Sequence, residues 1–525
     1  MGIYLNPNNE NFRKTLASGT YVDKTMMITE INRFIDTGNS YVCVSRPRRF
    51  GKTIAGNMLC AYYSKGCDSR ELFAPYKIAQ VPGFEDKLNK YNVIQIDLNG
   101  EFRRTLDSDT FLKKFQQKII KEFQREFPDV SIENGDSLAE AILTVYSITG
   151  ETFIILIDEY DVLVREKAEE GLFHAYLNFL NGLFKDNTLR PAIALAYLTG
   201  ILPIVRDKIQ SKLNVFEEYT ILDAGELAPF IGFTDEEVNE ICHNNNMDYE
   251  ECKRWYDGYS QYGLEIYNPV SVMRAMKAGR YGNYWSKTAS YAAISDQIEL
   301  NFDGTKDAII RMLSGERVDV DVLSFLNTMD HFTNRNDIFT YLIHLGYLAY
   351  DFNDETARIP NREIQSEWQR AIAANADYKV TNDIIAASKE LLSETIAGNE
   401  EAVRAALDVS HIHVTSNRSY NNEDALQSAI YLAYIYALNQ YTIIREMISG
   451  KGYADVVFIP FVPDKPAMII ELKRNSSKES ALNQIRNRQY FDSLSHYQGA
   501  LLFVGVNYDE KEKTHSCKIE RFTIS

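Results

Sequence analysis

Gly51, Lys52 and Thr53 have the residue types of a phosphate-binding loop. They follow the strand-like run YVCVS and open the helical pattern TIAGNMLCAYYSKG, which is the setting that a P-loop requires. A P-loop needs backbone N–H groups around the phosphates, a helix N-terminus that points at them, a lysine and a hydroxyl that binds Mg²⁺. Lys52 and Thr53 supply the last two, so these residues predict a nucleotide site.

The usual pattern G-x-x-x-x-G-K-[ST] is incomplete here, because its first glycine would stand at position 46 and the chain has Arg46. That glycine mainly lets the loop turn, and its position varies among nucleotide folds. A G-K-[ST] tripeptide also arises by chance about 0.3 times in a chain of this length. A second motif is therefore needed to support the interpretation.

Asp158 and Glu159 provide that second motif, at the end of the apolar run FIILIDE. In a Walker B pattern the aspartate holds Mg²⁺, usually through water, and the glutamate polarises the attacking water. An apolar strand that ends in acids is common by itself, but both motifs in this order in one α/β region predict nucleotide binding. Thr199, at the end of AIALAYLTG, is either a sensor of the γ-phosphate or an ordinary strand-end turn.

Arg48 and Arg49 leave two interpretations open. They are either extra cations for the β- and γ-phosphates or for contacts between subunits, or they are solvated and form an ion pair with Asp23 or Glu159. The residues predicted to bind the nucleotide are Arg46, Arg48, Arg49, Phe50, Gly51, Lys52, Thr53, Asp158 and Thr199, with Thr53 and Asp158 at its metal.

A second set of chemically suitable residues lies near the C-terminus: Asp455 in YADVVFI, and Glu471 and Lys473 in AMIIELK. Residues i and i+2 of a strand share a face, so Glu471 and Lys473 project to the same side, with Asp455 on the adjacent hairpin strand. Two carboxylates there can bind Mg²⁺, and a lysine beside the metal can orient or deprotonate the attacking water. The alternative is a pair of strand-edge acids with Lys473 as an ion-pair partner.

Two flanking helices add further candidates to this second site. Glu423, at the start of the preceding helix, is either a metal ligand or a first-turn acid stabilised by the helix dipole. Gln484 lies in the following helix, near a local basic run that suits phosphate contact.

The elements that must position these residues divide the chain into three regions. From about 20 to 225, short apolar runs alternate with amphipathic stretches, which is typical of a parallel sheet covered by helices. From 226 to 380 the patterns are mostly helical, and residues 337–361 fit a helix followed by a small hairpin. From 381 onward we expect the order α-β-β-β-α-β, with helices over 421–441 and 477–494 and a last strand over 498–509. The predicted domains are 1–225, 226–380 and 381–525.

Composition limits the classes of function. The chain has 525 residues, 45% hydrophobic and 25% charged, which is ordinary for a soluble globular protein of three or four domains. A net charge of −17 argues against broad, charge-driven wrapping of nucleic acid. Six scattered cysteines without a C-x-x-C pair predict free thiols in a reducing cytoplasm. The N-terminus has no apolar segment of a signal peptide, and no stretch is long enough to span a bilayer, so we expect a cytoplasmic protein without membrane contact.

Seven short stretches together resemble one bacterial protein family: YVDKT (21–25), RPRRFGKT (46–53), LIDEYD (156–161), TGILPI (199–204), GFTDEEV (232–238), RWYDGY (254–259) and YNPVSV (267–272). In this order they are similar to the AAA-ATPase-like family that carries a PD-(D/E)XK nuclease-like domain at the C-terminus, over essentially the whole chain. In that family the loop typically reads R-P-R-R-F-G-K-[ST], so the resemblance implies that Arg46 is the family's own form of the P-loop.

The resemblance implies an α/β fold in three parts: an AAA-like P-loop ATPase domain over 1–225, a helical or winged-helix lid over 226–380, and a restriction-endonuclease-like domain over 381–525. Glu159 would be catalytic in the first, and Asp455, Glu471 and Lys473 in the third. The implied cofactors are ATP and Mg²⁺, and the implied partner is nucleic acid, DNA in the first instance; the chain could form a homo-oligomer. The rival hypothesis is a nucleotide-driven switch or scaffold whose C-terminal domain binds nucleic acid without cutting it.

Overall fold

The computed structural model describes residues 2–104, 110–166, 168–204, 215–261, 263–285, 292–300, 302, 304–313, 315–323, 325, 332–374, 379–415, 430–449, 452–460, 465–487 and 499–524. The chain divides into two compact units. The first comprises Met1–Ser290 and Asp319–Ile364, and the second comprises Tyr291–Val318 and Gln365–Ser525. The three domain ranges given above stay a prediction.

A five-stranded parallel sheet forms the centre of the first unit. Its strands are β1 (Tyr41–Ser45), β2 (Asn92–Asp97), β3 (Phe153–Asp158), β4 (Ile193–Gly200) and β5 (Glu217–Tyr219), in the order β2-β3-β4-β1-β5. The first four are the predicted apolar runs, and they are buried almost throughout because helices cover the sheet on both faces. This confirms the predicted parallel sheet, to which the structure adds the short edge strand β5. The carboxyl ends of β1, β3 and β4 meet at one edge.

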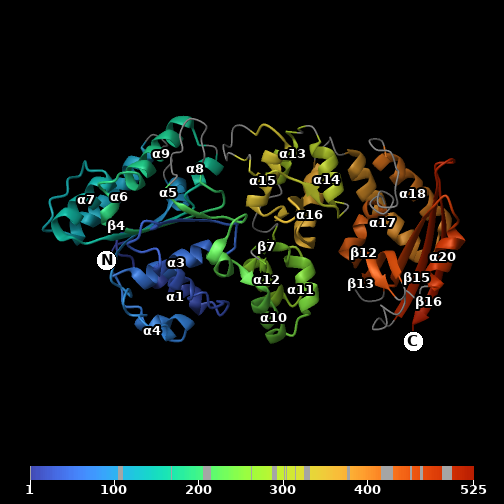
Figure 1. Ribbon diagram of the computed structural model, residues 1–525, viewed down its shortest axis with the longest axis horizontal. Coiled ribbons are helices and arrows are strands. Elements are labelled where there is room, and N and C mark those ends of the chain that lie inside the picture. Colours follow the sequence, from blue (N-terminus) through green and yellow to red (C-terminus); the bar gives the residue numbers. More distant parts are fainter. Residues whose placement is uncertain are drawn as a thin grey trace. The chain divides into compact units, whose positions relative to one another are not determined.

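Helices lie on both sides of this sheet (Figure 1), with α1 (Glu10–Ala17) and α3 (Lys52–Tyr63) on one side and α6 (Phe111–Glu126) on the other. α6 buries Phe111, Phe115, Ile119 and Phe123, which recur at the spacing that places side chains on one face of a helix. The further helices of this region are α2 (Met27–Asn32), α4 (Arg70–Phe73), α5 (Leu98–Arg104), α7 (Leu138–Thr149), α8 (Val162–Arg165) and α9 (Glu170–Phe184), with 3₁₀ turns η1 (Lys77–Gln80), η2 (Arg190–Ala192) and η3 (Gly225–Phe230).

The N-terminal segment pairs with the outer edge of β2. Leu5 forms an antiparallel bridge with Ile94, and the Gln95 N–H donates to the Tyr4 carbonyl at 2.8 Å. Glu122 of α6 accepts hydrogen bonds from three successive backbone N–H groups, those of residues 3, 4 and 5, at 3.0, 2.9 and 2.9 Å. The backbone groups of this sheet edge are therefore satisfied by a short segment that one carboxylate holds in place.

The rest of the first unit is mostly helical with small antiparallel sheets. The predicted helix and hairpin of residues 337–361 are present as α15 (Arg335–Leu345), β10 (Ala349–Asp351) and β11 (Thr356–Arg358). α10 begins after Thr234, which forms a capping box with Glu237. The remaining elements are β6 (Phe233–Thr234), α10 (Asp235–Asn244), α11 (Tyr249–Tyr256), β7 (Tyr259–Gln261), β8 (Leu264–Tyr267) and α12 (Pro269–Ala278). Two elements occur where the chain passes between units, β9 (Val318–Asp319) and α16 (Arg362–Ala374).

The second unit contains a five-stranded mixed sheet. Its strands are β12 (Tyr441–Ser449), β13 (Gly452–Pro460), β14 (Ala467–Arg474), β15 (Gly499–Asp509) and β16 (Thr514–Ile524), in that spatial order. β14 and β15 are parallel and the other neighbours are antiparallel. The predicted strands are all present, and the order α-β-β-β-α-β continues with β16, which the sequence analysis omitted. β16 is an edge strand in which Thr514, Arg521 and Phe522 are exposed, and its sequence lacks a continuous apolar run.

Helices cover both faces of this second sheet. α20 (Lys478–Asn487) packs on one face through Leu482 and Ile485, against Val457 and Phe503. The other face carries the larger apolar cluster, to which α17 (Lys379–Ala397), α18 (Glu400–Thr415) and the 3₁₀ turn η5 (Ile435–Asn439) contribute. α13 (Ala292–Ile298) and α14 (Thr305–Leu313) also belong to this unit. The helix predicted over 421–441 falls largely on residues 421–429, which lie outside the described ranges.

All six cysteines are free thiols, as predicted, and only Cys67 is not fully buried. Among the helices that the structure describes, none is both long enough and apolar enough to cross a membrane.

Candidate functional sites

The loop between β1 and α3 wraps around the side chain of Lys52. Its Nζ donates to the carbonyl oxygens of Arg46 and Pro47, both at 2.9 Å. The loop makes this turn with positive φ at Arg49 (70°) and Gly51 (97°), and Gly51 is the N-cap of α3. Such backbone angles favour glycine, which explains the glycine directly before the lysine. The loop therefore has the strand–turn–helix geometry that the sequence predicted.

Burial makes the Lys52 ammonium dependent on anionic partners. The side chain is 7% exposed, and this burial lowers the pKa of Lys52 to about 8, although the carboxylates of Asp158, Asp161 and Glu159 oppose the shift. A desolvated cation surrounded mostly by carbonyl oxygens is stabilised further by any anion that enters the loop. This is the electrostatic property that a phosphate-binding lysine needs.

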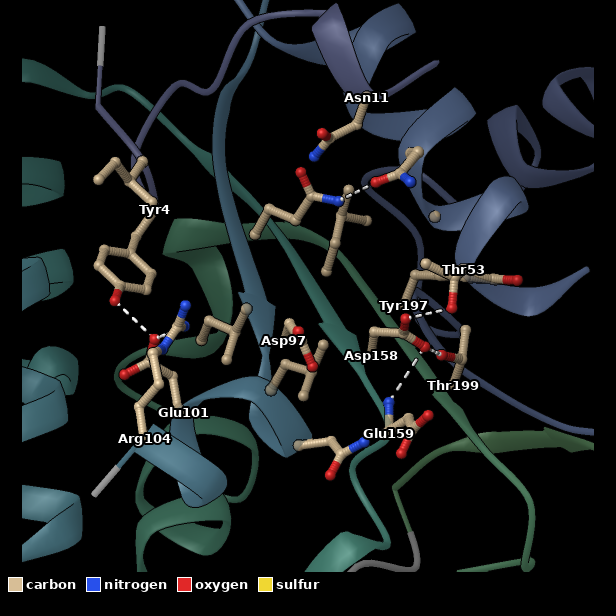
Figure 2. A pocket seen from close by; sticks show the side chains of 18 residues that line it. Tyr4, Asn11, Thr53, Asp97, Glu101, Arg104, Asp158, Glu159, Tyr197 and Thr199 are labelled. Atoms are coloured by element: carbon tan, nitrogen blue, oxygen red, sulfur yellow. Dashed lines mark hydrogen bonds and ion pairs between the residues drawn. The ribbon is translucent and has the colours of Figure 1, made fainter. Parts of the chain in front are cut away.

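Thr53, Asp158 and Thr199 form one hydrogen-bonded cluster at the carboxyl edge of the sheet (Figure 2). Thr53 Oγ1 donates to Asp158 Oδ2 at 2.6 Å, and Thr199 Oγ1 donates to Asp158 Oδ1. The three residues come from the first turn of α3, the end of β3 and the end of β4. A hydroxyl and a carboxylate at the foot of a phosphate loop are oxygen donors of the kind that Mg²⁺ prefers, so the residues present fit this ion.

Glu159 follows this cluster with a backbone φ of 53°, which is unusual for a residue other than glycine. Its Oε2 forms an ion pair with Nη2 of Arg165 at 2.7 Å, and Nε of the same arginine lies 3.0 Å from Asp161 Oδ2. Asp23 and Glu159 were the acids considered as ion-pair partners of Arg48 and Arg49. Glu159 is instead paired with Arg165. The other, Asp23, accepts from the backbone and hydroxyl of Thr25.

A cavity of about 500 Å³ opens beside the cluster (Figure 2). Thr53, Asp158, Glu159 and Thr199 line one side of it. Its remaining lining includes Asn57 of α3 and Gln95 and Asp97 of β2, and Gln95 Nε2 donates to Asn57 Oδ1 at 2.8 Å. Sequence reasoning missed these polar residues, although Asp97 ends the strand next to β3 and pairs in register with Asp158.

The arginines of the loop differ in their surroundings. Arg46 is fully buried, and its Nη1 donates to the carbonyl oxygens of Ser45 and Tyr219, both at 2.9 Å. Its Nε and Nη2 have no hydrogen-bond partner within the described part of the chain, and burial lowers its pKa to about 10. Arg46 thus links the loop to β5, whereas Arg48 is exposed and Arg49 is half-buried, and Phe50 is fully buried.

A second cavity of about 470 Å³ adjoins the loop at Gly51 and is mainly apolar. Among its lining residues are Tyr21, Val22, Phe50, Ile54, Met58, Phe233, Val270 and Met273, with the cations Lys24, Arg274 and Lys277. Lys24 Nζ donates to the Pro229 carbonyl at 2.6 Å and forms an ion pair with Glu237 at 2.5 Å. The stretches YVDKT, GFTDEEV and YNPVSV all contribute to this cavity, which sequence reasoning did not predict because its walls are distant along the chain.

The C-terminal candidates gather around Glu471, which is fully buried in the central strand β14. Lys473 Nζ lies 3.2 Å from Glu471 Oε1, and Gln484 Nε2 of α20 donates to the same oxygen. Asp455 Oδ2 accepts from the Leu472 N–H at 2.7 Å. Since Val456 pairs with Ile470, Asp455 lies opposite Glu471 across the two strands. The structure thus brings Asp455, Glu471, Lys473 and Gln484 together.

α20 approaches the sheet closely at Gly505, which pairs with Glu471. A Cβ atom at Gly505 would lie 2.6 Å from the Lys478 carbonyl oxygen and 3.0 Å from Leu482 Cγ. The missing side chain therefore lets α20 bring Gln484 within reach of Glu471.

The oxygen donors of Asp455 and Glu471 fit Mg²⁺ by type. Glu423, the third predicted ligand, lies outside the described residues. Among those that are described, no group of three or more His, Cys, Asp or Glu side chains could hold a metal ion.

Two family models match the chain and confirm the resemblance drawn from the motifs. Residues 9–210 match the family described as Predicted AAA-ATPase, and residues 421–517 match the PD-(D/E)XK nuclease superfamily. The first range contains the loop, Asp158, Glu159 and Thr199, and the second contains Asp455, Glu471, Lys473 and Gln484.

One curated relative is described as an uncharacterized protein in the vnfD 5′ region of Azotobacter chroococcum mcd 1. It is 24% identical over 292 residues, which cover 53% of this chain and 52% of the relative, so the chain spans about half the length of the relative it matches.

Solved structures with partial likeness include two from Aeropyrum pernix. The ORC2 protein (ADPNP–ADP complexes) has a TM-score of 0.29 at 10% identity, covering 64% of this chain and 88% of that one. The ORC1 protein in complex with DNA has a TM-score of 0.24 at 12% identity, covering 90% and 95%. At TM-scores this low, we draw no conclusion about this chain from either protein.

Proposed function

We propose that this chain binds and hydrolyses ATP and cleaves phosphodiester bonds of nucleic acid, DNA in the first instance. The proposal starts from its combination of an AAA-ATPase-like domain with a PD-(D/E)XK nuclease-like domain. The observation that carries the ATPase proposal is the 2.6 Å hydrogen bond between Thr53 Oγ1 and Asp158 Oδ2, which joins the phosphate loop to the acidic strand end. The ATP state would control the activity of the C-terminal domain.

In the ATP site, the backbone N–H groups of the loop and the start of α3 would surround the β- and γ-phosphates. Lys52 would exchange its two carbonyl partners for phosphate oxygens, and Arg48 and Arg49 would add cations at the rim. Thr53 and Asp158 would hold Mg²⁺, which neutralises charge on the β- and γ-phosphates when it is bound.

Hydrolysis would proceed by attack of water on the γ-phosphorus. The water oxygen forms a bond to phosphorus while the bond from phosphorus to the bridging oxygen breaks, and ADP leaves with that oxygen. Glu159 would accept a proton from the water, and Thr199 would contact the γ-phosphate from the end of β4.

The apolar cavity beside Gly51 is proposed as the site of the nucleotide base. Its volume of about 470 Å³ falls in the range of small-molecule pockets, and its apolar lining suits a flat aromatic ring. Arg274 and Lys277, which also line it, would then face the ribose and the phosphates.

Isothermal calorimetry with ATP, with and without Mg²⁺, tests the ATP site through a conservative pair of variants. Thr53→Ala should lose the Mg²⁺-dependent part of the affinity, and Thr53→Ser should keep it because the hydroxyl remains. Equal affinities in wild type, Thr53→Ala and Thr53→Ser would contradict the proposed metal contact.

For the C-terminal domain, Asp455 and Glu471 would hold Mg²⁺, which stabilises the charge that develops on the phosphate when it is bound. Lys473 would orient the water, and Gln484 would fix the Glu471 carboxylate through its hydrogen bond. The test is conversion of supercoiled plasmid to nicked or linear DNA with Mg²⁺ or Mn²⁺, compared with EDTA and with the Asp455→Asn variant. Intact plasmid under all conditions would contradict cleavage of DNA.

The second candidate for this domain is binding of nucleic acid without cleavage, under the control of the nucleotide state. Glu471 is fully buried and in contact with Lys473 and Gln484, and this burial favours binding without cleavage. A carboxylate that binds a metal ion has to be accessible to that ion. Retention of DNA by the wild type in a filter-binding assay, without any metal-dependent nicking, would support this candidate.

A further inference from the structure

Arg165 connects the two acidic residues that follow Asp158. Its side chain is 7% exposed, and its guanidinium contacts Glu159 Oε2 through Nη2 at 2.7 Å and Asp161 Oδ2 through Nε at 3.0 Å. Burial alone would lower the pKa of Arg165, but the carboxylates of Asp161 and Glu159 outweigh it and raise the pKa. This arginine therefore stays charged and holds both carboxylates.

Asp161 fixes the position of Arg165. It is fully buried, and its Oδ2 also accepts the backbone N–H groups of Ile201 and Leu202 at 3.0 and 2.9 Å. These N–H groups come directly after β4, which ends with Thr199 and Gly200. Arg165 is thus anchored to the end of β4 by a carboxylate that cannot turn away without losing two backbone hydrogen bonds.

The same contacts restrain Glu159 in the task that the proposed function gives it, because they engage one of its two carboxylate oxygens. A glutamate that accepts a proton from water needs a free carboxylate oxygen directed at the γ-phosphate, whereas Oε2 is bound to an arginine on α8. A hydrogen bond between two charged groups, here a buried arginine and a partly exposed glutamate, is among the stronger ones in proteins. Glu159 has a left-handed backbone, with φ 53°, at the position from which it reaches Arg165.

We propose that Arg165 is a positioning residue that restrains Glu159, and that ATP hydrolysis requires the Arg165–Glu159 ion pair to open. This inference rests on the proposed ATPase function. Thr199 donates to Asp158, and two residues later Ile201 donates to Asp161, so both carboxylates are attached to the same strand end. A γ-phosphate that displaces Thr199 from Asp158 shifts this strand end, and the shift reaches Arg165 through Asp161.

The experiment measures the steady-state rate of ATP hydrolysis by the full chain at saturating ATP. Arg165→Gln removes the charge but leaves an amide that can donate to buried Asp161. We expect kcat to rise by about tenfold, which corresponds to about 1.4 kcal/mol less activation free energy, with KM nearly unchanged. The matched control is Arg103→Gln, the same substitution at an exposed arginine. Arg103 pairs at 3.7 Å with Glu166, the residue that follows Arg165 in the sequence. This control should leave the rate unchanged.

The double variant Arg165→Gln with Glu159→Gln shows whether the gain acts through Glu159, and it should be as slow as Glu159→Gln alone. If Arg165→Gln does not fold, as judged by circular dichroism, Arg165→Lys replaces it, since lysine keeps a charge near Asp161 but lacks the planar fork.

Three results would overturn the proposal. A folded Arg165 variant with an unchanged or lower kcat would mean that the arginine supports the structure or the reaction. A gain that persists without Glu159 would mean that it arises elsewhere. Absence of ATP hydrolysis in wild type and variant alike would overturn the proposed ATPase function, and this inference with it.

Discussion

Replacement of Lys473 by alanine should weaken the C-terminal domain measurably while abolishing its proposed cleavage. Its Nζ lies 3.2 Å from an oxygen of Glu471, and the exposed fractions of the two side chains are 21% and 0%. A hydrogen bond to a charged group contributes about 1.5–3 kcal/mol. Because Gln484 continues to donate to the same oxygen, we expect a loss near the low end, about 1.5 kcal/mol in the free energy of unfolding. In a domain of 150–250 residues this lowers Tm by about 3–6 °C.

Loss of the same ammonium should slow DNA cleavage much more than it destabilises the fold. A group that orients or deprotonates the attacking water typically contributes about 10²–10⁴-fold in rate. Plasmid nicking, ATP hydrolysis and thermal unfolding followed by circular dichroism are measured on one preparation. ATP hydrolysis should stay near the wild-type rate, because Lys473 lies in the unit that does not contain the phosphate loop.

The matched control is Lys511→Ala, which removes an exposed lysine from the turn between β15 and β16. It should change neither Tm nor cleavage. A folded Lys473→Ala protein that nicks plasmid at the wild-type rate would refute the assignment of Lys473. An equal loss of cleavage in Lys511→Ala would show that the activity follows overall charge and not this contact.

Three further outcomes are expected. Burial lowers the pKa of Lys52 to about 8 from its ordinary 10.5, so the unfolded chain binds the proton more tightly. The free energy of unfolding from urea titrations, relative to Lys52→Met, should therefore be constant below pH 8 and rise by at most about 3 kcal/mol up to pH 10.5. A difference that does not change with pH would mean that the lysine is solvated. Glu159→Gln should bind ATP with nearly wild-type affinity by calorimetry and hydrolyse it about 10²–10⁴-fold more slowly, and unchanged turnover would exclude it as the proton acceptor. Gly505→Ala should lower the free energy of unfolding in urea by about 1–3 kcal/mol, because its Cβ would lie 2.6 Å from the Lys478 carbonyl oxygen. The control is Gly182→Ala on α9, where the space around the added Cβ is open. Equal stability of the two variants would contradict the close packing at Gly505.

The sequence was sufficient for the elements whose signal is local. The four longer strands of the first sheet are mostly apolar runs, because each is buried over most of its length, and the acids and hydroxyls at their ends stand out against those runs. Gly51 and Lys52 lie at the turn between a strand and a helix, so their position follows from the motif. The C-terminal strands and α20 were predictable for the same reason, and the roles assigned to their charged residues stay predictions.

Features that depend on contacts between distant residues were not predictable. Arg46 is part of the loop motif, yet its guanidinium turns beneath the loop to the Tyr219 carbonyl, on a strand of three residues with no apolar run. The apolar cavity is assembled from segments that lie some 200 residues apart in the chain, and each wall alone looks like ordinary core. The partner of Glu159 was unknowable for a related reason, since several cations lie within reach in sequence and only the packed structure selects Arg165.

The short N-terminal segment on β2 bears on how this protein would aggregate. Residues 4–6 occupy the hydrogen-bonding edge of β2, and Glu122 alone accepts three of the backbone N–H groups that hold the segment there. If the segment detaches, a largely buried strand gains an open edge, which is a template for a strand of another molecule. Glu122 thus protects the chain against self-association, because it keeps this segment on the edge of β2.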